Sequence, residues 1–114
     1  MDIQKMFFTF DGRLNRKPYF FGHLAIGLIS ALFTMIMDNS DSGFIAILGA
    51  VIGIALMIAS VSLMIKRLHD LDKGGLWVLI MLIPIVDFFF GLYLLFAKGT
   101  DGYNQYGEDP LQTF

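Results

Sequence analysis

The feature that most constrains this chain is a run of 23 residues, 43–65, without a single Asp, Glu, Lys or Arg. Among its mostly apolar residues, only Ser60 and Ser62 carry polar side chains. As an α-helix the run would be about 34 Å long, at roughly 1.5 Å of rise per residue. That length crosses the roughly 30 Å hydrocarbon core of a bilayer. The run therefore predicts a membrane-spanning helix, and Lys66 and Arg67 follow it directly.

Two further apolar segments repeat this pattern. Residues 18–37 carry no formal charge and one His, and residues 75–97 carry one charge, Asp87. The chain is 56% hydrophobic and 16% charged, whereas soluble domains average about 45–50% apolar and about 25% charged residues. These features predict an all-α integral membrane protein. We expect a bundle of three transmembrane helices, formed by residues 1–114 as a single domain.

The first apolar segment also resembles a secretory signal peptide, because positive charges precede it. A signal peptide ends in a small-residue cleavage site, whereas a polar connector, residues 38–42, follows this segment. The segment is also long for the apolar part of a signal peptide. We therefore interpret residues 18–37 as a membrane span, joined by a short link to an antiparallel second span.

Polar segments flank the spans and predict their orientation. Residues 1–17 form an arm in which basic residues alternate with Phe, residues 66–74 form a loop, and residues 98–114 form a turn-rich polar tail. Four Lys or Arg residues precede the first span, three lie in the 66–74 loop, one follows the third span, and none lies in residues 38–42. The positive-inside rule then places the N-terminal arm and the 66–74 loop in the cytoplasm. With three crossings, the tail would lie outside.

A rival topology breaks the third span between Pro84 and Asp87. Pro84 cannot donate a helical hydrogen bond, and Asp87 could cap a second half-helix. Residues 75–97 would then form a re-entrant hairpin whose two ends both face the cytoplasm. Turn backbone exposed to lipid is costly unless protein covers it, and two neighbouring helices give little cover. We therefore expect three crossings, with a break or kink at residues 84–87 as the alternative.

The second span carries a pair of glycines at helical spacing. Gly49 and Gly53 form a G-x-x-x-G pair, a pattern that lets two helix backbones approach closely in lipid. The pair predicts a helix contact, either within the chain or with a second copy or another membrane protein.

Several polar residues near the membrane surface are candidates for functional or structural roles. They are Arg13, Arg16, Arg67, His69, Asp70, Asp87 and Asn104. His69 and Asp70 have the composition of an acid–base pair, but adjacent residues on a helix do not face each other. No Ser or Cys in a recognisable nucleophile setting accompanies them, so we expect no catalysis. We expect instead that Arg67, His69, Asp70 and Asp72 cap helix ends and bridge to the N-terminal arm. In particular, we expect Arg13 or Arg16 to pair with Asp70 or Asp72.

Composition also argues against several other functions. The chain has no cysteine, so it cannot form a disulfide or a Cys-based metal site. Its net charge of −2 lacks the basic footprint of a nucleic-acid-binding protein. His23 and His69 lie at different predicted depths, so they do not form a metal site. We expect no cofactor and no nucleic-acid partner.

The polar motifs, taken in order, resemble one protein family. They are Phe10-Asp11-Gly12-Arg13-Leu14-Asn15-Arg16, Tyr19-Phe20, Arg67-Leu68-His69-Asp70, Gly75-Leu76-Trp77, Ile83-Pro84 and Asn104-Gln105-Tyr106-Gly107-Glu108-Asp109-Pro110. This arrangement resembles the domain-of-unknown-function family 805, a group of small bacterial inner-membrane proteins. The resemblance implies a bacterial inner-membrane location and a helical bundle, and it implies no activity. Asp72 and Asp87 depart from the family pattern, in which small residues, often Gly, are expected.

Three functions are compatible with these features. The first is a structural, regulatory or accessory membrane protein that is not an enzyme. The second is an oligomeric transporter or channel subunit with Asp87 as the ion or proton site, because three helices cannot enclose a pore. The third is binding of anionic lipid headgroups by the basic residues of the cytoplasmic face, Arg13, Arg16, Lys17, Lys66, Arg67 and Lys73.

Asp87 also has a structural interpretation. A carboxyl group at mid-depth in lipid favours its protonated form and could donate a hydrogen bond to a neighbouring helix. The predicted partners of Asp87 are Ser30, Thr34, Ser60 and Ser62.

Overall fold

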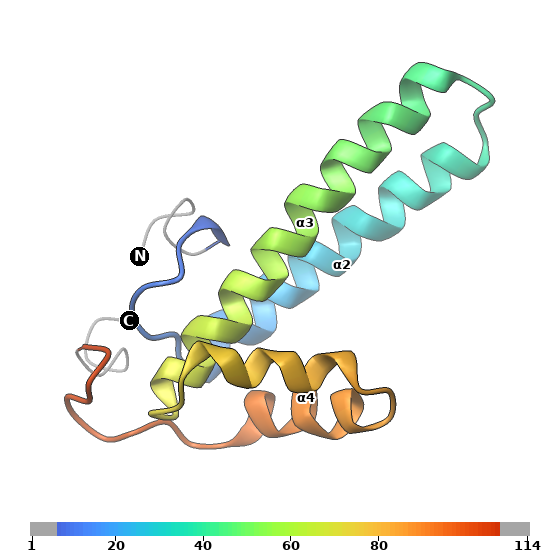
Figure 1. Ribbon diagram of the computed structural model, residues 1–114. Helices are drawn as coiled ribbons and strands as arrows, with labels where there is room; N and C mark the ends of the chain where they lie inside the picture. Colours follow the sequence, from blue (N-terminus) through green and yellow to red (C-terminus); the bar gives the residue numbers. More distant parts are fainter. Residues whose placement is uncertain (1–6, 108–114) are drawn as a thin grey trace.

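The computed structural model describes residues 7–107, and its longest elements are two antiparallel helices (Figure 1). Helix α2 comprises Arg16–Asp38, and helix α3 comprises Gly43–Asp70. The short link between them makes the two helices run side by side. Both are long and apolar enough to cross a membrane. The structure thus confirms that the first two predicted spans are helical.

Helix α3 is longer than predicted at its C-terminal end. It begins as expected after Ser42, whose hydroxyl accepts a hydrogen bond from the Ile45 amide at 3.4 Å. It does not end at residue 65, however, because residues 66–70 continue the helix. The helix ends where Asp72 adopts a left-handed φ of 60°, a common way to terminate an α-helix. The expected loop 66–74 is therefore wrong in its first half.

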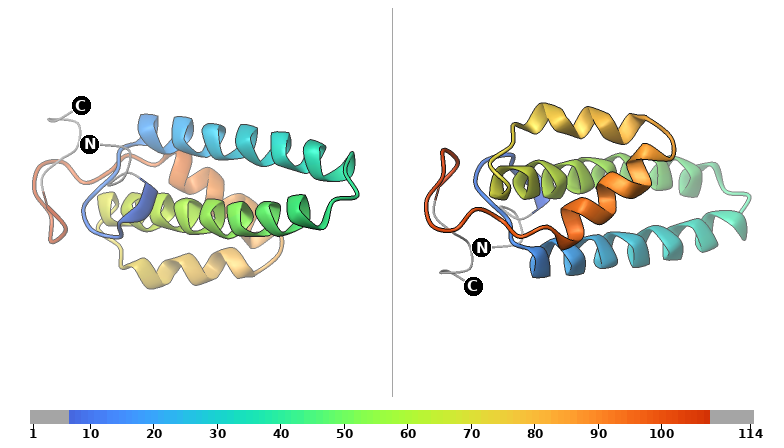
Figure 2. Two further views of the ribbon diagram at one scale, coloured as in Figure 1. Left: turned by 90° about the horizontal axis from the view of Figure 1, so that it is seen from above. Right: turned by 90° about the horizontal axis from the view of Figure 1, so that it is seen from below.

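The third predicted span is not one continuous helix, and this prediction is wrong. Residues 75–97 instead contain a 3-10 helix, η1 (Gly75–Leu82), and an α-helix, α4 (Val86–Phe96). The two fold back on each other as a hairpin (Figure 2). At about 2.0 Å of rise per 3-10 residue and 1.5 Å per α-helical residue, each arm is roughly 16 Å long. Each arm therefore reaches about half the thickness of a bilayer core.

Two local features permit the reversal at residues 83–85. Pro84 has no backbone N–H and cannot continue the hydrogen bonding of η1. Ile85 adopts a φ of 72°, a strained value for a β-branched residue. Asp87 consequently lies in the first turn of α4, close to the hairpin tip, and not in the middle of a span.

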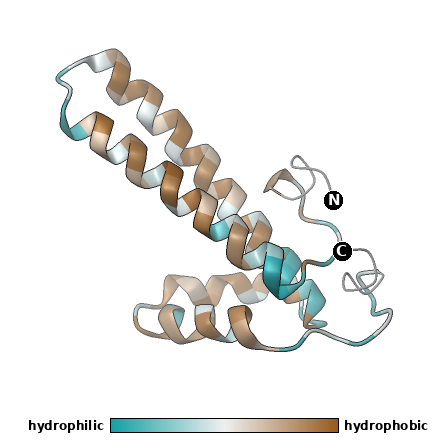
Figure 3. Cartoon of the chain, turned by 180° about the vertical axis from the view of Figure 1, so that it is seen from behind, coloured by the Kyte–Doolittle hydropathy of each residue, from teal (hydrophilic) through white to brown (hydrophobic). Residues whose placement is uncertain are grey.

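Large apolar side chains are exposed along the helices, whereas hydrophilic residues concentrate at one end of the molecule and in the link at the other. Figure 3 shows this pattern, with hydrophilic residues at the base of α3, in the tail and in the 39–42 link. We call the end of the molecule that contains the base of α3 and the tail the polar end; it comprises residues 9–16, 62–74 and 97–107. The N-terminal arm, the end of α3 and the tail all meet there.

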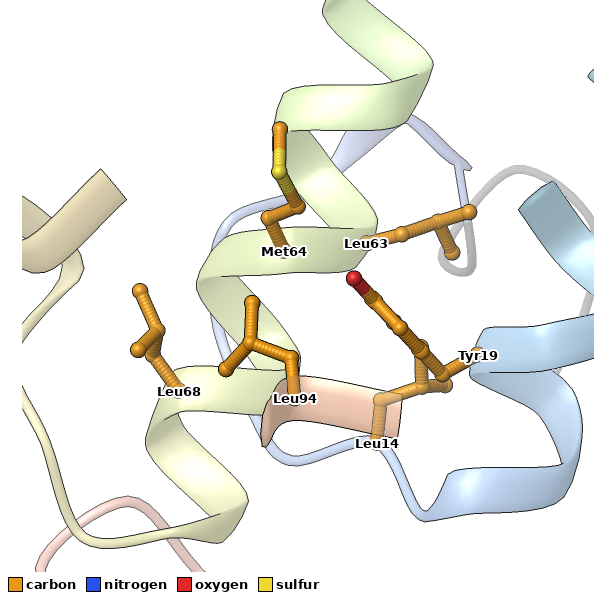
Figure 4. Close-up of a cluster of buried hydrophobic side chains, with 6 residues drawn as sticks. All are labelled: Leu14, Tyr19, Leu63, Met64, Leu68 and Leu94. Atoms are coloured by element: carbon orange, nitrogen blue, oxygen red, sulfur yellow. The ribbon is translucent and has the colours of Figure 1, made fainter. Parts of the chain in front are cut away.

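The buried hydrophobic core also lies at the polar end. It contains six side chains, shown in Figure 4: Leu14, Tyr19, Leu63, Met64, Leu68 and Leu94. They come from the arm, α2, α3 and α4. Four segments that are distant in the sequence thus converge around the last turns of α3, and this convergence positions the polar side chains described next.

Candidate functional site

A cluster of buried ions occupies the polar end. Arg13, Arg67 and Asp70 are only 4%, 0% and 3% exposed. The Arg13 Nε donates to Asp70 Oδ1 at 3.0 Å, and Arg67 Nη1 donates to Asp70 Oδ2. One carboxylate therefore bridges two guanidinium groups. The predicted pairing between the arm and the end of α3 is confirmed for Arg13 and Asp70.

Arg67 uses its remaining donors on backbone carbonyls. Its Nε donates to the Leu94 carbonyl at 2.6 Å, and its Nη1 to the Leu14 carbonyl at 3.3 Å. Its Nη2 donates to the carbonyl of Ala97. Carbonyls at a helix C-terminus lack partners within the helix, so Arg67 satisfies the end of α4. A single side chain thereby links α3 to both the arm and the hairpin.

Arg13 connects the same carboxylate to the tail. Its guanidinium donates to the carbonyls of Thr100, Gly102 and Gly107, the last at 3.2 Å. The Thr100 amide in turn donates to the main-chain carbonyl of Asp70 at 2.7 Å. The tail passes so close to Asp70 that a side chain at Gly99 would overlap its carboxylate. A small residue is therefore required at that position.

His69 makes a separate set of contacts. Its Nδ1 lies 2.9 Å from the Gly12 carbonyl, and because a carbonyl only accepts, Nδ1 carries the proton. The Tyr106 ring stacks on the imidazole at 3.9 Å, with 4° between the planes. The Asn104 Nδ2 donates to the His69 carbonyl at 2.8 Å. His69 and Asp70 therefore serve different contacts and do not form the acid–base pair that their adjacency suggests.

We call these side chains the polar clamp: Arg13, Arg67, His69, Asp70 and Asn104. They hold the arm, the end of α3, the end of α4 and the tail together. Five of the seven candidate residues thus meet in one place, and all five lie in the motifs quoted above. The sequence indicated the clamp through the position of its motifs: the polar residues lie near the two termini and at the end of the second span.

The other two candidates lie outside the clamp. Arg16 is exposed, and its Nη1 donates to the Phe96 carbonyl at 3.2 Å. Asp87 is partly exposed, and within residues 7–107 its side chain forms no hydrogen bond or ion pair. The bonds predicted from Asp87 to serine or threonine side chains of other helices are therefore not formed. One of those predicted partners, Ser62, donates instead to the carbonyl of Thr9 at 2.5 Å.

The two glycines of the G-x-x-x-G pair have different surroundings. A side chain at Gly49 would overlap the end of Met37 on α2, so this glycine serves the contact within the chain. Nothing in the described part of the chain lies within 4 Å of a Cβ placed at Gly53. Gly53 lines an open groove with Ile26 and Ser30. The pair is therefore not one contact surface.

Sequence reasoning missed several buried groups. Lys66, predicted in a loop, is fully buried, and its carbonyl accepts from the Leu14 amide at 3.1 Å. Asn15 precedes α2, and within the described chain its Oδ1 is buried without a hydrogen bond. Most acceptors of the clamp are backbone carbonyls, which any residue supplies. The residue types in the sequence could therefore not have identified these acceptors.

Two long apolar helices with exposed side chains, held at one end by a buried ionic clamp, define a small helical membrane protein. The profile described as "Protein of unknown function (DUF805)" matches residues 7–108. The chain belongs to this family, in agreement with the resemblance of its motifs.

Two relatives from Escherichia coli (strain K12) give its location. Inner membrane protein YhaI is 29% identical over 112 residues, which cover 96% of this chain and 92% of YhaI. Inner membrane protein YhaH is 28% identical over 117 residues, which cover 96% of this chain and 93% of YhaH. The chain is thus a small protein of the bacterial inner membrane. No solved structure matches it.

Proposed function

We propose that α2 and α3 cross the inner membrane in opposite directions, and that η1 and α4 form a re-entrant hairpin. Segments that share hydrogen bonds lie on the same side of a bilayer. The Thr100 amide donates to the Asp70 carbonyl at 2.7 Å, and Arg13 donates to the carbonyl of Gly107 at 3.2 Å. These bonds support a single side for the arm, the end of α3 and the tail. This topology replaces the three crossings expected from the sequence.

The distribution of basic residues supports a cytoplasmic position for the polar end. Of the eight Lys and Arg residues in the chain, seven lie in the described part, at the arm, the end of α3 or the tail, and Lys5 lies outside it. The opposite link, residues 39–42, has none. The positive-inside rule therefore favours a cytoplasmic N-terminus. With a hairpin, Lys98 also lies on that side.

The cost of placing turn backbone in lipid is partly offset by the turn itself. A hairpin tip exposes N–H and C=O groups that lipid cannot satisfy. Pro84 removes one N–H donor, and the Ile83 amide donates to the Ile80 carbonyl at 3.0 Å. The Asp87 amide donates to the Ile83 carbonyl, also at 3.0 Å. These local bonds reduce the number of unsatisfied groups at the tip.

Single cysteines in this cysteine-free chain test the topology. Asp41 and Asp101 are both exposed, and a cysteine at each position can be treated with a membrane-impermeant thiol reagent in whole cells. We expect Asp41→Cys to react in intact cells once the outer membrane is permeabilised. We expect Asp101→Cys to react only after lysis. Labelling of both positions in intact cells would instead support three crossings and reject the hairpin.

The function we propose is that of a structural or accessory membrane protein without enzyme activity. The observation that carries this proposal is the bonding of the clamp. Arg13 and Arg67 donate their hydrogen bonds to the Asp70 carboxylate and to backbone carbonyls. Such groups hold segments together and are not available to a substrate. The function then depends on the folded structure and not on the chemistry of these side chains.

This proposal predicts that a cellular phenotype follows stability and not the chemistry of one residue. His69→Gln and Asn104→Ala each remove a clamp hydrogen bond, and both variants can be compared in a strain that lacks the protein. We expect the phenotype of each variant to follow its loss of folding free energy. If His69→Gln abolished the phenotype while folding as well as Asn104→Ala, the imidazole would have a chemical role, and the proposal would be wrong.

Ion coupling through Asp87 is the second candidate. It is favoured by one observation: within residues 7–107 this carboxyl group, near the hairpin tip, forms no hydrogen bond or ion pair. Asp87→Asn keeps the shape of the side chain but cannot titrate. If that variant is folded and supports the normal cellular phenotype, ion coupling is rejected. Loss of the phenotype in a folded Asp87→Asn protein would place the transporter interpretation first.

An accessory role also requires a contact with another chain. The predicted contact through Gly49 and Gly53 stays a prediction only for Gly53, because Gly49 already packs against α2. Gly53→Leu would fill the open groove beside Ile26 and Ser30. We expect this variant to lower the oligomeric mass in mild detergent, with Gly27→Leu on α2, which is equally open, as the control.

A further inference from the structure

The basic side chains at the polar end and at the start of α2 differ in their surroundings. Arg13 and Arg67 are buried, and both pair with Asp70. Arg16 and Lys17, in the first turn of α2, are exposed, and within residues 7–107 neither forms an ion pair. The predicted basic face is therefore smaller than the sequence implied: Arg13, Lys66 and Arg67 are buried, Lys73 is partly exposed, and Arg16 and Lys17 are exposed.

Arg16 and Lys17 border a crevice with apolar walls. The crevice lies between the start of α2 and the end of α4, and its other lining residues are Phe20, Leu95 and Phe96. The two helix ends lie side by side in Figure 2, and Arg16 Nη1 donates to the Phe96 carbonyl at 3.2 Å. That bond uses one of the five N–H donors of the guanidinium. Cationic donors thus stand directly beside an apolar cleft.

We propose that this crevice binds a diacyl phospholipid with an anionic headgroup. The headgroup phosphate contacts Arg16 and Lys17, and one acyl chain lies against Phe20 and Phe96. The position fits such a ligand, because these cations begin an apolar helix of an inner-membrane protein and so lie at headgroup depth. The start of a helix also carries partial positive charge. Arg13 and Arg67 take no part in this binding.

The test uses the full-length protein in dodecyl maltoside micelles that contain phosphatidylglycerol or phosphatidylcholine. Native mass spectrometry measures how many lipids of each kind stay bound. We expect the parent protein to retain phosphatidylglycerol in preference to phosphatidylcholine. A basic group near an anionic surface contributes roughly a fivefold preference. Lys17→Gln should therefore lower the preference about fivefold, and the double variant Arg16→Gln, Lys17→Gln should lower it further.

Two controls keep the result decisive. Lys98→Gln removes another exposed cation of the polar end, one that pairs with Asp101 at 3.3 Å outside the crevice, and should leave the preference unchanged. Lys17 has no hydrogen bond or ion pair in the described chain, so Lys17→Gln tests the site even if the double variant unfolds. An unchanged preference in Lys17→Gln, or an equal loss in Lys98→Gln, would overturn the proposal.

A third arm separates a lipid site from a simple phosphate site. Glycerol 3-phosphate has the anionic group of the lipid but no acyl chains. We expect it not to displace phosphatidylglycerol at equal concentration, because the apolar walls contribute to binding. Displacement by glycerol 3-phosphate would mean that the crevice binds phosphate alone, and the lipid assignment would be wrong.

Discussion

The two halves of α3 have opposite patterns of exposure. In the first half, apolar side chains face outward: Phe44 is 71% exposed and Ile47 is 68% exposed. In the last turns, charged side chains face inward: Lys66 and Arg67 are fully buried. A soluble protein shows the reverse arrangement. The apolar part of the helix suits lipid, and its last turns are held by the polar clamp.

This difference indicates where the stability of the molecule resides. In lipid, apolar side chains gain little by packing on one another, because acyl chains are equally apolar. The contact between the apolar parts of α2 and α3 therefore contributes less stability per residue than a similar contact in water. Buried ions, by contrast, are strongly destabilising when one partner is removed. Substitutions in the clamp should accordingly have much larger effects than substitutions in the apolar parts of these helices.

The largest effect is expected for Arg67→Ala. This change leaves a buried carboxylate short of one partner and leaves the carbonyls of Leu94 and Ala97 without a donor. Breaking a buried ion pair costs about 3–5 kcal/mol, so we expect a loss of that size in the free energy of unfolding, measured in detergent. Arg67→Lys should not restore it, because an ammonium group lacks the planar fork.

The matched control for Arg67→Ala lies in the first half of the same helix. Ile47 is 68% exposed, and Ile47→Ala should change stability by about 0.5 kcal/mol or less, as surface substitutions usually do. Equal losses in the two variants would contradict the contrast between the halves of α3.

Arg13 and Asp70 test whether the clamp acts as a unit. Residues in one hydrogen-bond network show interaction energies of about 0.5–3 kcal/mol in double-mutant cycles. We expect Arg13→Ala and Asp70→Ala together to cost less than the sum of the single changes, by roughly 1–3 kcal/mol. Strict additivity of the unfolding free energies would show that the 2.9 Å ion pair between these residues contributes nothing to stability.

Two glycine substitutions, one in the polar end and one in the apolar part of α3, should change stability by intermediate amounts. Gly99→Ala forces a methyl group against the Asp70 carboxylate, and overpacking of this kind costs about 1–3 kcal/mol. Gly53→Ala meets nothing within 4 Å in the described chain. It should be neutral or stabilising by up to about 1 kcal/mol, because Ala favours helix more than Gly does. Thermal unfolding of both variants measures the difference, and equal losses would reject it.

A smaller effect than that of Gly99→Ala is expected at Asp72, where the polar end contains a local strain. Its φ of 60° suits glycine better than an L-residue with a side chain, by roughly 1 kcal/mol. Within residues 7–107 its carboxylate accepts one hydrogen bond, an exposed one from Gln105 at 3.1 Å. Asp72→Gly should therefore raise the free energy of unfolding by about 0.5–1 kcal/mol. A loss of stability would mean that the bond to Gln105 outweighs the strain.

The sequence alone determined the membrane location and the first two helices. Long runs without charge, such as residues 43–65, are unstable in water and stable in lipid whatever their neighbours are. Residue types and topology also predicted that Arg13 or Arg16 pairs with Asp70 or Asp72, and the pair that forms is Arg13 with Asp70. These features depend on the types of residues and on their order in the chain, both of which can be read from the sequence.

Only the tertiary structure decided the course of residues 75–97 and the geometry of the clamp. Pro84 and Asp87 are compatible with either a kinked span or a hairpin, since a broken hydrogen-bond ladder permits both. The hairpin results because the tail, once beyond α4, binds the end of α3 through Asp70 and Arg13. Those bonds go mainly to backbone carbonyls, which every residue has. Their partners therefore depend on which segments meet in space, and that information lies in the fold.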